Sequence, residues 1–181
     1  MKSIILDRDG IIIKCMPPHE YVTQESEVEY LVENIVVFKK IKKETPIFIV
    51  TNQQGVGKGL MSSKNLNNIN NKILRYLNKY NIKILKVYTC NHLESDNCIC
   101  RKPKPGMLLR IAKEFGIDLS QSLFIGDSET DVICANSVKC KSVYFGINTI
   151  KCLPTFTAAN SFELLKILEL NGFISGETKT I

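Results

Sequence analysis

Short apolar segments of strand length alternate with stretches of helical periodicity along most of this chain. The segments expected to form strands are residues 3–6, 46–50, 84–88, 122–125 and 141–145. Those expected to form helices are residues 31–43, 62–80, 105–116, 128–137 and 161–170. This alternation is typical of an α/β domain in which helical crossovers join the strands of a mainly parallel sheet.

The chain has a length and composition that suit one folded domain. It contains 181 residues, of which 44% are hydrophobic and 23% are charged, and it shows no internal repeat or long linker. A chain of this size buries roughly 70% of its surface on folding, so it needs no disulfide framework. We therefore expect one Rossmann-like domain over residues 1–181, with a polar tail at 171–181 that is free to fray.

Hydropathy and cysteine content bear on the cellular location. The apolar stretch at residues 3–6 is too short for a signal-peptide core, and no apolar run approaches the ~20 residues that span a bilayer. Seven cysteines, an odd number with three of them between residues 90 and 100, fit a disulfide framework poorly. These features predict a cytoplasmic protein without membrane association, and they favour metal binding by the clustered cysteines.

Polar residues directly follow three of the expected strands. They read Asp-Arg-Asp-Gly at residues 7–10, Thr-Asn-Gln-Gln-Gly at 51–55 and Gly-Asp-Ser-Glu-Thr-Asp at 126–131. Ligands of open α/β sheets bind outside the carboxyl ends of the strands, so these three segments are expected to converge on one site.

Paired carboxylates in these segments indicate a magnesium site. Asp7 and Asp9 can face one cavity, and with Asp127 they offer the hard oxygen ligands that Mg²⁺ prefers. A carboxylate beside such an ion can attack phosphorus, while a second carboxylate serves as general acid and base. Taken alone, Asp-x-Asp-Gly is more typical of a surface turn, and it is the two other polar strand ends in the same chain that favour the metal site.

A second group of residues has the composition of a zinc site. Cys90, His92, Cys98 and Cys100 supply three thiolates and one imidazole within a single loop, residues 90–100. Four protein ligands fill a tetrahedral Zn²⁺ ion and leave no position for water, so the ion is expected to be structural. The alternative is a chance cluster of buried free cysteines. The remaining cysteines, Cys15, Cys134, Cys140 and Cys152, are interpreted as small apolar residues.

The three polar strand ends together resemble the haloacid dehalogenase superfamily of phosphohydrolases. The resemblance implies a nucleophile, a general acid/base, a phosphate-holding hydroxyl, a charge-balancing lysine and an acidic metal ligand, which fall on Asp7, Asp9, Thr51, Lys102 and Asp127. It also implies that Asp7, Asp9 and Asp127 bind Mg²⁺ and that Asp131 is a supporting acidic residue.

The string from Cys98 to Met107, Cys-Ile-Cys-Arg-Lys-Pro-Lys-Pro-Gly-Met, narrows this resemblance. With the Cys-x-His before it, the string is similar to the capless, zinc-containing branch that acts on heptose 1,7-bisphosphate or histidinol phosphate. The resemblance implies a phosphorylated metabolite as substrate, D-glycero-D-manno-heptose 1,7-bisphosphate in the first place and histidinol phosphate as the alternative. Ile13 and Ser128 depart from the pattern of the branch, and both departures concern substrate identity rather than hydrolysis.

The charge of the chain leaves room for other anionic partners. The net charge is +6, so a nucleic-acid-binding or end-processing zinc protein is the alternative from another class. No aromatic residue accompanies the basic residues between 90 and 107, which disfavours a nucleic-acid partner.

Arg101 and Asn52 are expected to contact substrate beside Lys102. A noncatalytic scaffold is disfavoured because every catalytic position is filled, and the sequence does not indicate an oligomeric state.

Overall fold

The computed structural model describes residues 1–17 and 20–174, and its centre is a six-stranded parallel sheet. The strands lie in the order β3-β2-β1-β4-β5-β6, and every neighbouring pair is parallel. Their bounds are β1 Ile4–Leu6, β2 Ile47–Asn52, β3 Ile84–Cys90, β4 Leu123–Gly126, β5 Lys141–Phe145 and β6 Phe156–Ala158. The expected α/β Rossmann-like fold is therefore confirmed.

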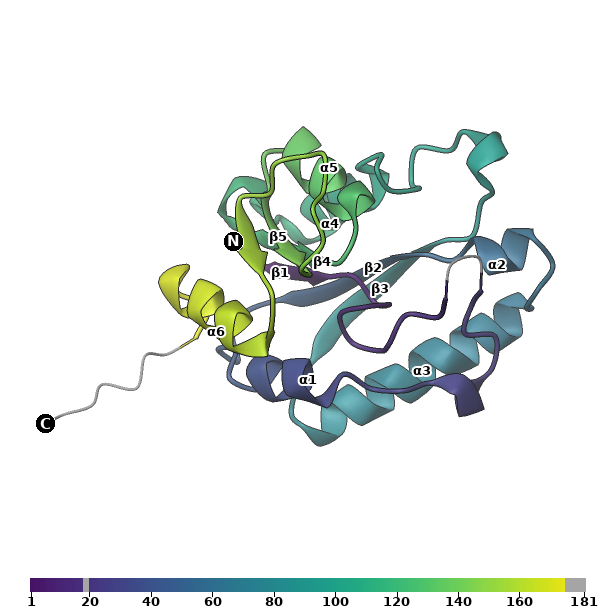
Figure 1. Cartoon of the computed structure of the whole chain (residues 1–181), viewed down its shortest axis with the longest axis horizontal. Coiled ribbons are helices and arrows are strands. Elements are labelled where there is room, and N and C mark those ends of the chain that lie inside the picture. The colour runs from purple at the N-terminus through teal and green to yellow at the C-terminus, as the bar shows by residue number, and fades with distance from the viewer. Residues whose placement is uncertain (18–19, 175–181) are drawn as a thin grey trace, which may run out of the picture.

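Helices cover both faces of this sheet (Figure 1). Helices α1 (Val32–Phe38), α3 (Ser63–Lys79) and α6 (Ser161–Leu170) lie on one face, and α4 (Gly106–Phe115) and α5 (Glu129–Ser137) lie on the other. A short helix, α2 (Gln54–Gly57), follows β2, and the 3₁₀ helices are η1 (Glu25–Glu27), η2 (Glu94–Asp96) and η3 (Leu119–Gln121). No helix in the described ranges is long and apolar enough to cross a membrane.

Two separate apolar clusters form the core because successive strand residues point to opposite faces. Ile4 and Leu6 of β1 belong to the cluster under α1, α3 and α6, whereas Ile5 belongs to the cluster under α4 and α5. Cys134 and Cys140 lie buried in the second cluster, as expected of small apolar residues. A central strand buried on both faces explains why residues 3–6 are continuously apolar.

The elements differ from the expected ones in three places. Strand β6 and helix α2 were not expected, and α1 ends at Phe38 rather than continuing to residue 43. Ile41 leaves the helix to form a bridge with Ile174. Phe173 and Ile174 are buried, although they lie in the stretch expected to fray, and the remainder of that stretch, residues 175–181, is outside the described residues.

The order of the strands determines where a ligand can bind. The chain runs outward from β1 to β2 and β3, and then crosses to β4 on the other side of β1. A crevice at the carboxyl ends of the strands is expected where the order reverses, between β1 and β4. The segments that follow β1, β2 and β4 all begin at this edge of the sheet.

Candidate active site

Asp7 is the first residue beyond β1, and its position is set by the central strands. Its backbone N–H donates to the carbonyl of Ile125 on β4 at 2.9 Å, which continues the pairing of the two strands. Gly10 then turns the chain with a φ of +78°. A Cβ atom at Gly10 would collide with the side chain of Asp127, so the close approach of these two loops requires glycine.

A buried lysine lies between two of the carboxylates. Lys102 Nζ is 2.8 Å from Asp7 Oδ1 and 2.6 Å from Asp131 Oδ1, and its side chain is 3% exposed. Asn52, the last residue of β2, fixes this lysine through the backbone: its Nδ2 donates to the Lys102 carbonyl at 3.0 Å, and its Oδ1 accepts from the Lys102 N–H at 3.1 Å. Asn52, which was expected to contact substrate, therefore also holds the lysine, and it lines a pocket beside Asp9.

Three carboxylates form the acidic part of the site. One oxygen from each of Asp7, Asp127 and Asp131 lies within 4.8 Å of the others. Asp131 also caps α5, since its Oδ2 accepts from the N–H of Ser128 at 3.1 Å and from its hydroxyl at 2.6 Å. A Cβ atom at Gly126 would overlap this Asp131 carboxylate. Hard oxygen donors gathered in this way fit the requirements of Mg²⁺.

Burial dominates the electrostatics of this cluster. It raises the pKa of Asp7 well above its ordinary value, and the neighbouring Lys102 only partly opposes that rise. Burial also raises the pKa of Asp127. Desolvation alone would lower the pKa of Lys102, but attraction by Asp131 and Asp7 outweighs it and raises that pKa. The two carboxylates therefore favour the charged form of Lys102, and an added divalent cation would favour the ionised form of the acids.

Asp9 faces a different set of partners. Its Oδ2 accepts from Gln53 Nε2 at 2.8 Å, from Arg8 Nε at 3.2 Å and from the Thr51 hydroxyl at 3.3 Å, and its Oδ1 accepts from Arg8 Nη2 at 3.0 Å. Thr51 thus lies beside the second carboxylate, and its role in holding phosphate stays a prediction. Within the described ranges, the carboxylate group that could hold a metal contains Asp131 and not Asp9.

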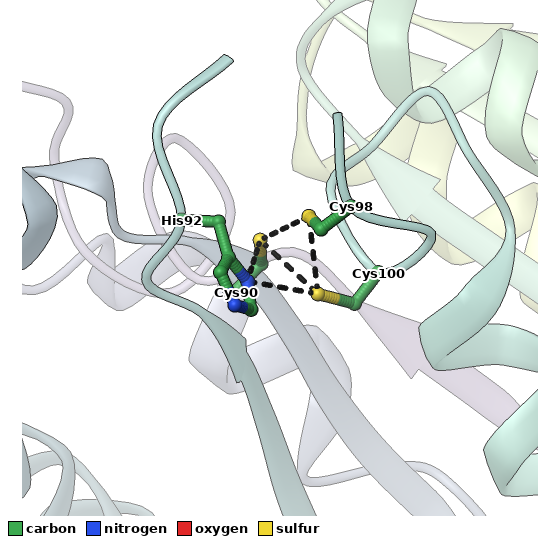
Figure 2. A group of neighbouring side chains, drawn as sticks. All are labelled: Cys90, His92, Cys98 and Cys100. Carbon is green, nitrogen blue, oxygen red and sulfur yellow. Dashed lines mark hydrogen bonds between the residues drawn. The ribbon is translucent and has the colours of Figure 1, made fainter. Parts of the chain in front are cut away.

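The Cys/His loop brings its four expected ligands together. Figure 2 shows Cys98 and Cys100 facing Cys90 and His92, which lie at the end of β3. The sulfur atoms are 3.4–3.6 Å apart, and His92 Nδ1 is 3.3 Å from the Cys100 sulfur and 3.6 Å from that of Cys90. A tetrahedral ion with Zn–S bonds of about 2.3 Å places its ligands roughly 3.7 Å apart, so the donor types and their spacing fit zinc.

Two pockets open beside these residues. One, of about 160 Å³, is lined by Asp9, Gln53, Cys15 and Tyr21 among others. The other, of about 300 Å³, lies between the Cys/His loop and α5 and includes Arg101 and Lys102. Within the described part of the chain, the buried Arg101 Nη1 has no hydrogen-bond partner. Two cationic side chains, Arg101 and Lys102, therefore line this second pocket, and the Nη1 atom of Arg101 is itself buried.

The comparisons with known proteins agree with this geometry. A family model described as polynucleotide kinase 3 phosphatase matches residues 2–144. A D-glycero-alpha-D-manno-heptose-1,7-bisphosphate 7-phosphatase from Campylobacter jejuni is 37% identical over 134 residues, which is 72% of this chain and 74% of that protein. The chain belongs to the haloacid dehalogenase-like phosphatases, in the family of the heptose bisphosphate phosphatases and HisB.

Two further members of this phosphatase family show how far the similarity extends. The crystal structure of D,D-heptose 1,7-bisphosphate phosphatase from B. bronchiseptica, complexed with magnesium and phosphate, covers 95% of this chain and all of that chain. Its TM-score is 0.84 and its identity 26%. The histidine biosynthesis bifunctional protein HisB of Campylobacter jejuni is 31% identical over 80% of this chain, but the match covers 42% of HisB. The chain is therefore a phosphatase of this family.

Three contacts of this phosphatase were not expected from the sequence. Arg8 and Gln53 both donate hydrogen bonds to Asp9. Both residues lie next to predicted site residues in the sequence, but neither was itself predicted to belong to the site. Cys15, interpreted as a small apolar residue, is instead exposed, and its thiol donates to Asp127 Oδ2 at 3.2 Å. Cys15 follows an apolar run, residues 11–13, so no local pattern marks its exposure.

Proposed function

We propose that the chain is a D-glycero-D-manno-heptose 1,7-bisphosphate 7-phosphatase that forms an aspartyl-phosphate on Asp7. The observation that carries the proposal is the buried pairing of Asp7 with Lys102 at the strand ends, in a chain similar over most of its length to phosphatases named for this substrate. Histidinol phosphate is the alternative substrate, because HisB is also among the relatives.

In the first half of the reaction, a carboxylate oxygen of Asp7 attacks phosphorus and forms a P–O bond. The bond from phosphorus to the sugar oxygen breaks, and Asp9 gives a proton to that oxygen. Lys102 Nζ, 2.8 Å from Asp7, stabilises negative charge on the transferring group. The Thr51 hydroxyl, which donates its one proton to Asp9 Oδ2 at 3.3 Å, would turn to donate to a phosphate oxygen of the substrate.

In the second half, water attacks the phosphorus of the aspartyl-phosphate and breaks its bond to Asp7. Asp9 takes the proton from this water, so inorganic phosphate leaves and both carboxylates return to their starting states. In this proposal Asp7, Asp9 and Asp127 would bind Mg²⁺, and Asp131 would be a supporting acidic residue beside them. The bound ion would neutralise negative charge on the nucleophile and on the phosphate. The carboxylates of Asp7, Asp127 and Asp131 lie close enough together for this role, and the Asp9 carboxylate is outside that cluster.

The Cys/His loop has a structural role in this proposal. Zinc held by Cys90, His92, Cys98 and Cys100 would tie the end of β3 to the segment that leads directly into Arg101 and Lys102. The ordering of that segment places the buried lysine in the site. Because four protein atoms complete the coordination, this ion takes no part in the chemistry.

Arg101 is the residue proposed to distinguish a bisphosphate from a monophosphate. Its Nη1 is buried without a partner in the described ranges, in a pocket that also includes Lys102. Two other cations at the rim are engaged, because Lys104 Nζ donates to Asn97 at 2.6 Å and Lys58 Nζ donates to the Tyr21 hydroxyl at 3.2 Å. A guanidinium binds phosphate through two parallel hydrogen bonds.

The test is a comparison of kcat/KM for three substrates with purified, magnesium-supplemented protein: heptose 1,7-bisphosphate, histidinol phosphate and a DNA oligonucleotide ending in a 3′-phosphate. The oligonucleotide is included because the matched family model is described as a polynucleotide 3′ phosphatase. The proposal expects the highest value for the heptose bisphosphate. A higher value for either of the other two would overturn the assigned substrate and leave the phosphatase family unchanged.

A cytoplasmic location stays a prediction from the cysteine content.

A further inference from the structure

We propose that Arg8 is a positioning residue, which orients the Asp9 carboxylate so that Oδ1 is the oxygen that gives and takes the proton. The inference rests on the proposed role of Asp9 as general acid and base. Arg8 lies between the two catalytic aspartates in sequence, and its side chain is 1% exposed. A guanidinium buried this completely is held by specific partners, since an unpaired buried charge is strongly unfavourable.

The contacts of Arg8 fix its guanidinium in three directions. Nε donates to Asp9 Oδ2 at 3.2 Å, and Nη2 donates to Asp9 Oδ1 at 3.0 Å, so one edge of the planar group grips both carboxylate oxygens. On the other side, Nη1 donates to Asn70 Oδ1 on α3 at 3.1 Å. This two-point contact sets the plane of the carboxylate, which a single hydrogen bond does not do.

The two oxygens of Asp9 are not equivalent. Oδ2 accepts from three groups, Arg8, Gln53 and Thr51, whereas Oδ1 accepts only from Arg8 within the described residues. A carboxylate oxygen has about two lone-pair positions, so Oδ2 is fully engaged and Oδ1 retains one. The Asp9 side chain is 27% exposed and lines a pocket, so a substrate oxygen can reach it.

Loss of the Arg8 contact would free the rotation of this carboxylate. Gln53 and Thr51 both bind Oδ2, and neither restrains Oδ1. A displacement of ~1 Å in a reacting group can lower a rate by about 100-fold. Asp9 assists both halves of the reaction, but only the first half depends on the leaving group: a sugar alkoxide needs the proton, whereas a nitrophenolate leaves without it. The value of kcat/KM reports this first half, because hydrolysis of the aspartyl-phosphate follows release of the leaving group.

The experiment compares Arg8→Met, Arg8→Lys and Asp9→Asn on a sugar phosphate and on 4-nitrophenyl phosphate. We expect Arg8→Met to lower kcat/KM for the sugar phosphate about 100-fold and kcat/KM for the aryl phosphate only a few-fold. Arg8→Lys, which keeps the charge but not the two-point grip, should restore little. Arg75→Met is the matched control, because Arg75 is exposed on α3 and pairs with Glu25; both rates should stay unchanged.

Equal losses on the two substrates, or no loss, in Arg8→Met would overturn the inference and indicate a purely structural residue. Asp9→Asn separates this result from the proposed function. If Asp9→Asn loses more activity on the sugar phosphate than on the aryl phosphate and Arg8→Met does not, only the positioning role of Arg8 is wrong. If neither variant shows this larger loss on the sugar phosphate, the role of Asp9 as general acid is wrong as well. If the Arg8 variants do not fold, Asn70→Ala serves in their place, because it removes only the hydrogen bond to Arg8 Nη1. We expect it to lower kcat/KM for the sugar phosphate more than kcat/KM for the aryl phosphate, by a smaller factor than Arg8→Met. Without this selective loss, the inference is wrong.

Discussion

Lys102 and Asp7 form a buried ion pair, with Nζ 2.8 Å from Oδ1, and the strand ends beside β1 converge on it. Asp7 follows β1, and Lys102 follows the Cys/His loop. The ion pair therefore connects the central strand to a loop that contributes few buried apolar side chains. Removal of one partner of a buried pair leaves the other without compensation. The variants below therefore separate loss of chemistry from loss of structure.

Asp7→Asn keeps the shape of the side chain and removes the anionic attacking oxygen. We expect hydrolysis to fall by several orders of magnitude, while the fold survives because Asp131 still pairs with Lys102 at 2.6 Å. The measurements are kcat, trapping of a phosphorylated protein and the melting temperature. Asp118→Asn, at an exposed aspartate, is the control. A folded Asp7→Asn protein that keeps more than about a tenth of the rate would contradict covalent catalysis by Asp7.

Asn52→Ala removes both hydrogen bonds to the Lys102 backbone. We expect the free energy of unfolding to fall by roughly 1–3 kcal/mol and kcat to fall with it, because the lysine loses its support. Denaturant unfolding and steady-state kinetics measure the two effects. Asn67→Ala, at an exposed position of α3, should show neither. A rise in KM with unchanged stability and kcat would instead assign Asn52 to substrate binding.

Cys98→Ser removes one thiolate from the Cys/His cluster. Elemental analysis should find about one equivalent of zinc in the parent protein and little in the variant. Activity and protease resistance of the loop should fall together, and added Mg²⁺ should restore neither. Cys152→Ser, outside the cluster, is the matched control. A zinc-free variant with full activity would rule out the structural role of the ion.

Arg101→Ala tests the second phosphate contact. The lost charge-assisted hydrogen bond is worth about 1.5–3 kcal/mol, so the preference for a sugar bisphosphate over the matching monophosphate should fall about ten- to a hundredfold. The ratio of the two kcat/KM values is the measurement. Lys104→Ala should change this ratio less, since its ammonium is bound to Asn97. If the two variants change the ratio equally, the role given to Arg101 is wrong.

Glu114→Gln tests an ion pair remote from the site. Hydrogen bonds from Lys86, at 2.6 Å, and from Tyr88 lower the pKa of Glu114 from 4.5 to about 2. A carboxylate whose pKa is lower in the folded protein than in the unfolded chain stabilises the fold at any pH above its pKa in the unfolded chain. This stabilisation is lost as the pH falls through the pKa of the group in the folded protein. The difference in melting temperature between parent and variant should therefore be full above pH 5 and vanish toward pH 2. Salt should reduce it, and a difference independent of pH would refute the pairing.

The sequence predicts most of the sheet and the positions of the acidic residues because those signals are local. Apolar runs mark the strands, and polar residues of the site lie at their carboxyl ends: Asp7 and Asp127 directly follow β1 and β4, and Thr51 is the next-to-last residue of β2. Strand β6 was missed because its three residues, Phe156–Ala158, are too few to show a period of two. The early end of α1 depends on the pairing of Ile41 with Ile174, which is distant in sequence.

The partners of individual side chains were harder to predict. Asn52 and Asp9 stand at expected positions, but their orientations depend on Lys102 and Arg8, and no periodicity encodes such contacts. The Cys/His cluster was predictable because its four ligands lie within eleven residues, and the chemistry of the donors limits what they can bind. Spacing thus predicts which residues meet, and packing determines how they face each other.

Gly10 and Gly126 affect any attempt to transplant this site into another scaffold. A methyl group at Gly10 would occupy the space of the Asp127 carboxylate, and one at Gly126 that of Asp131. A designer who grafts the aspartates and the lysine onto a foreign parallel sheet must also clear a side chain from two backbone positions, one of them with a positive φ. An alanine at either position would displace a carboxylate from the acidic cluster while every charged residue remained in the sequence.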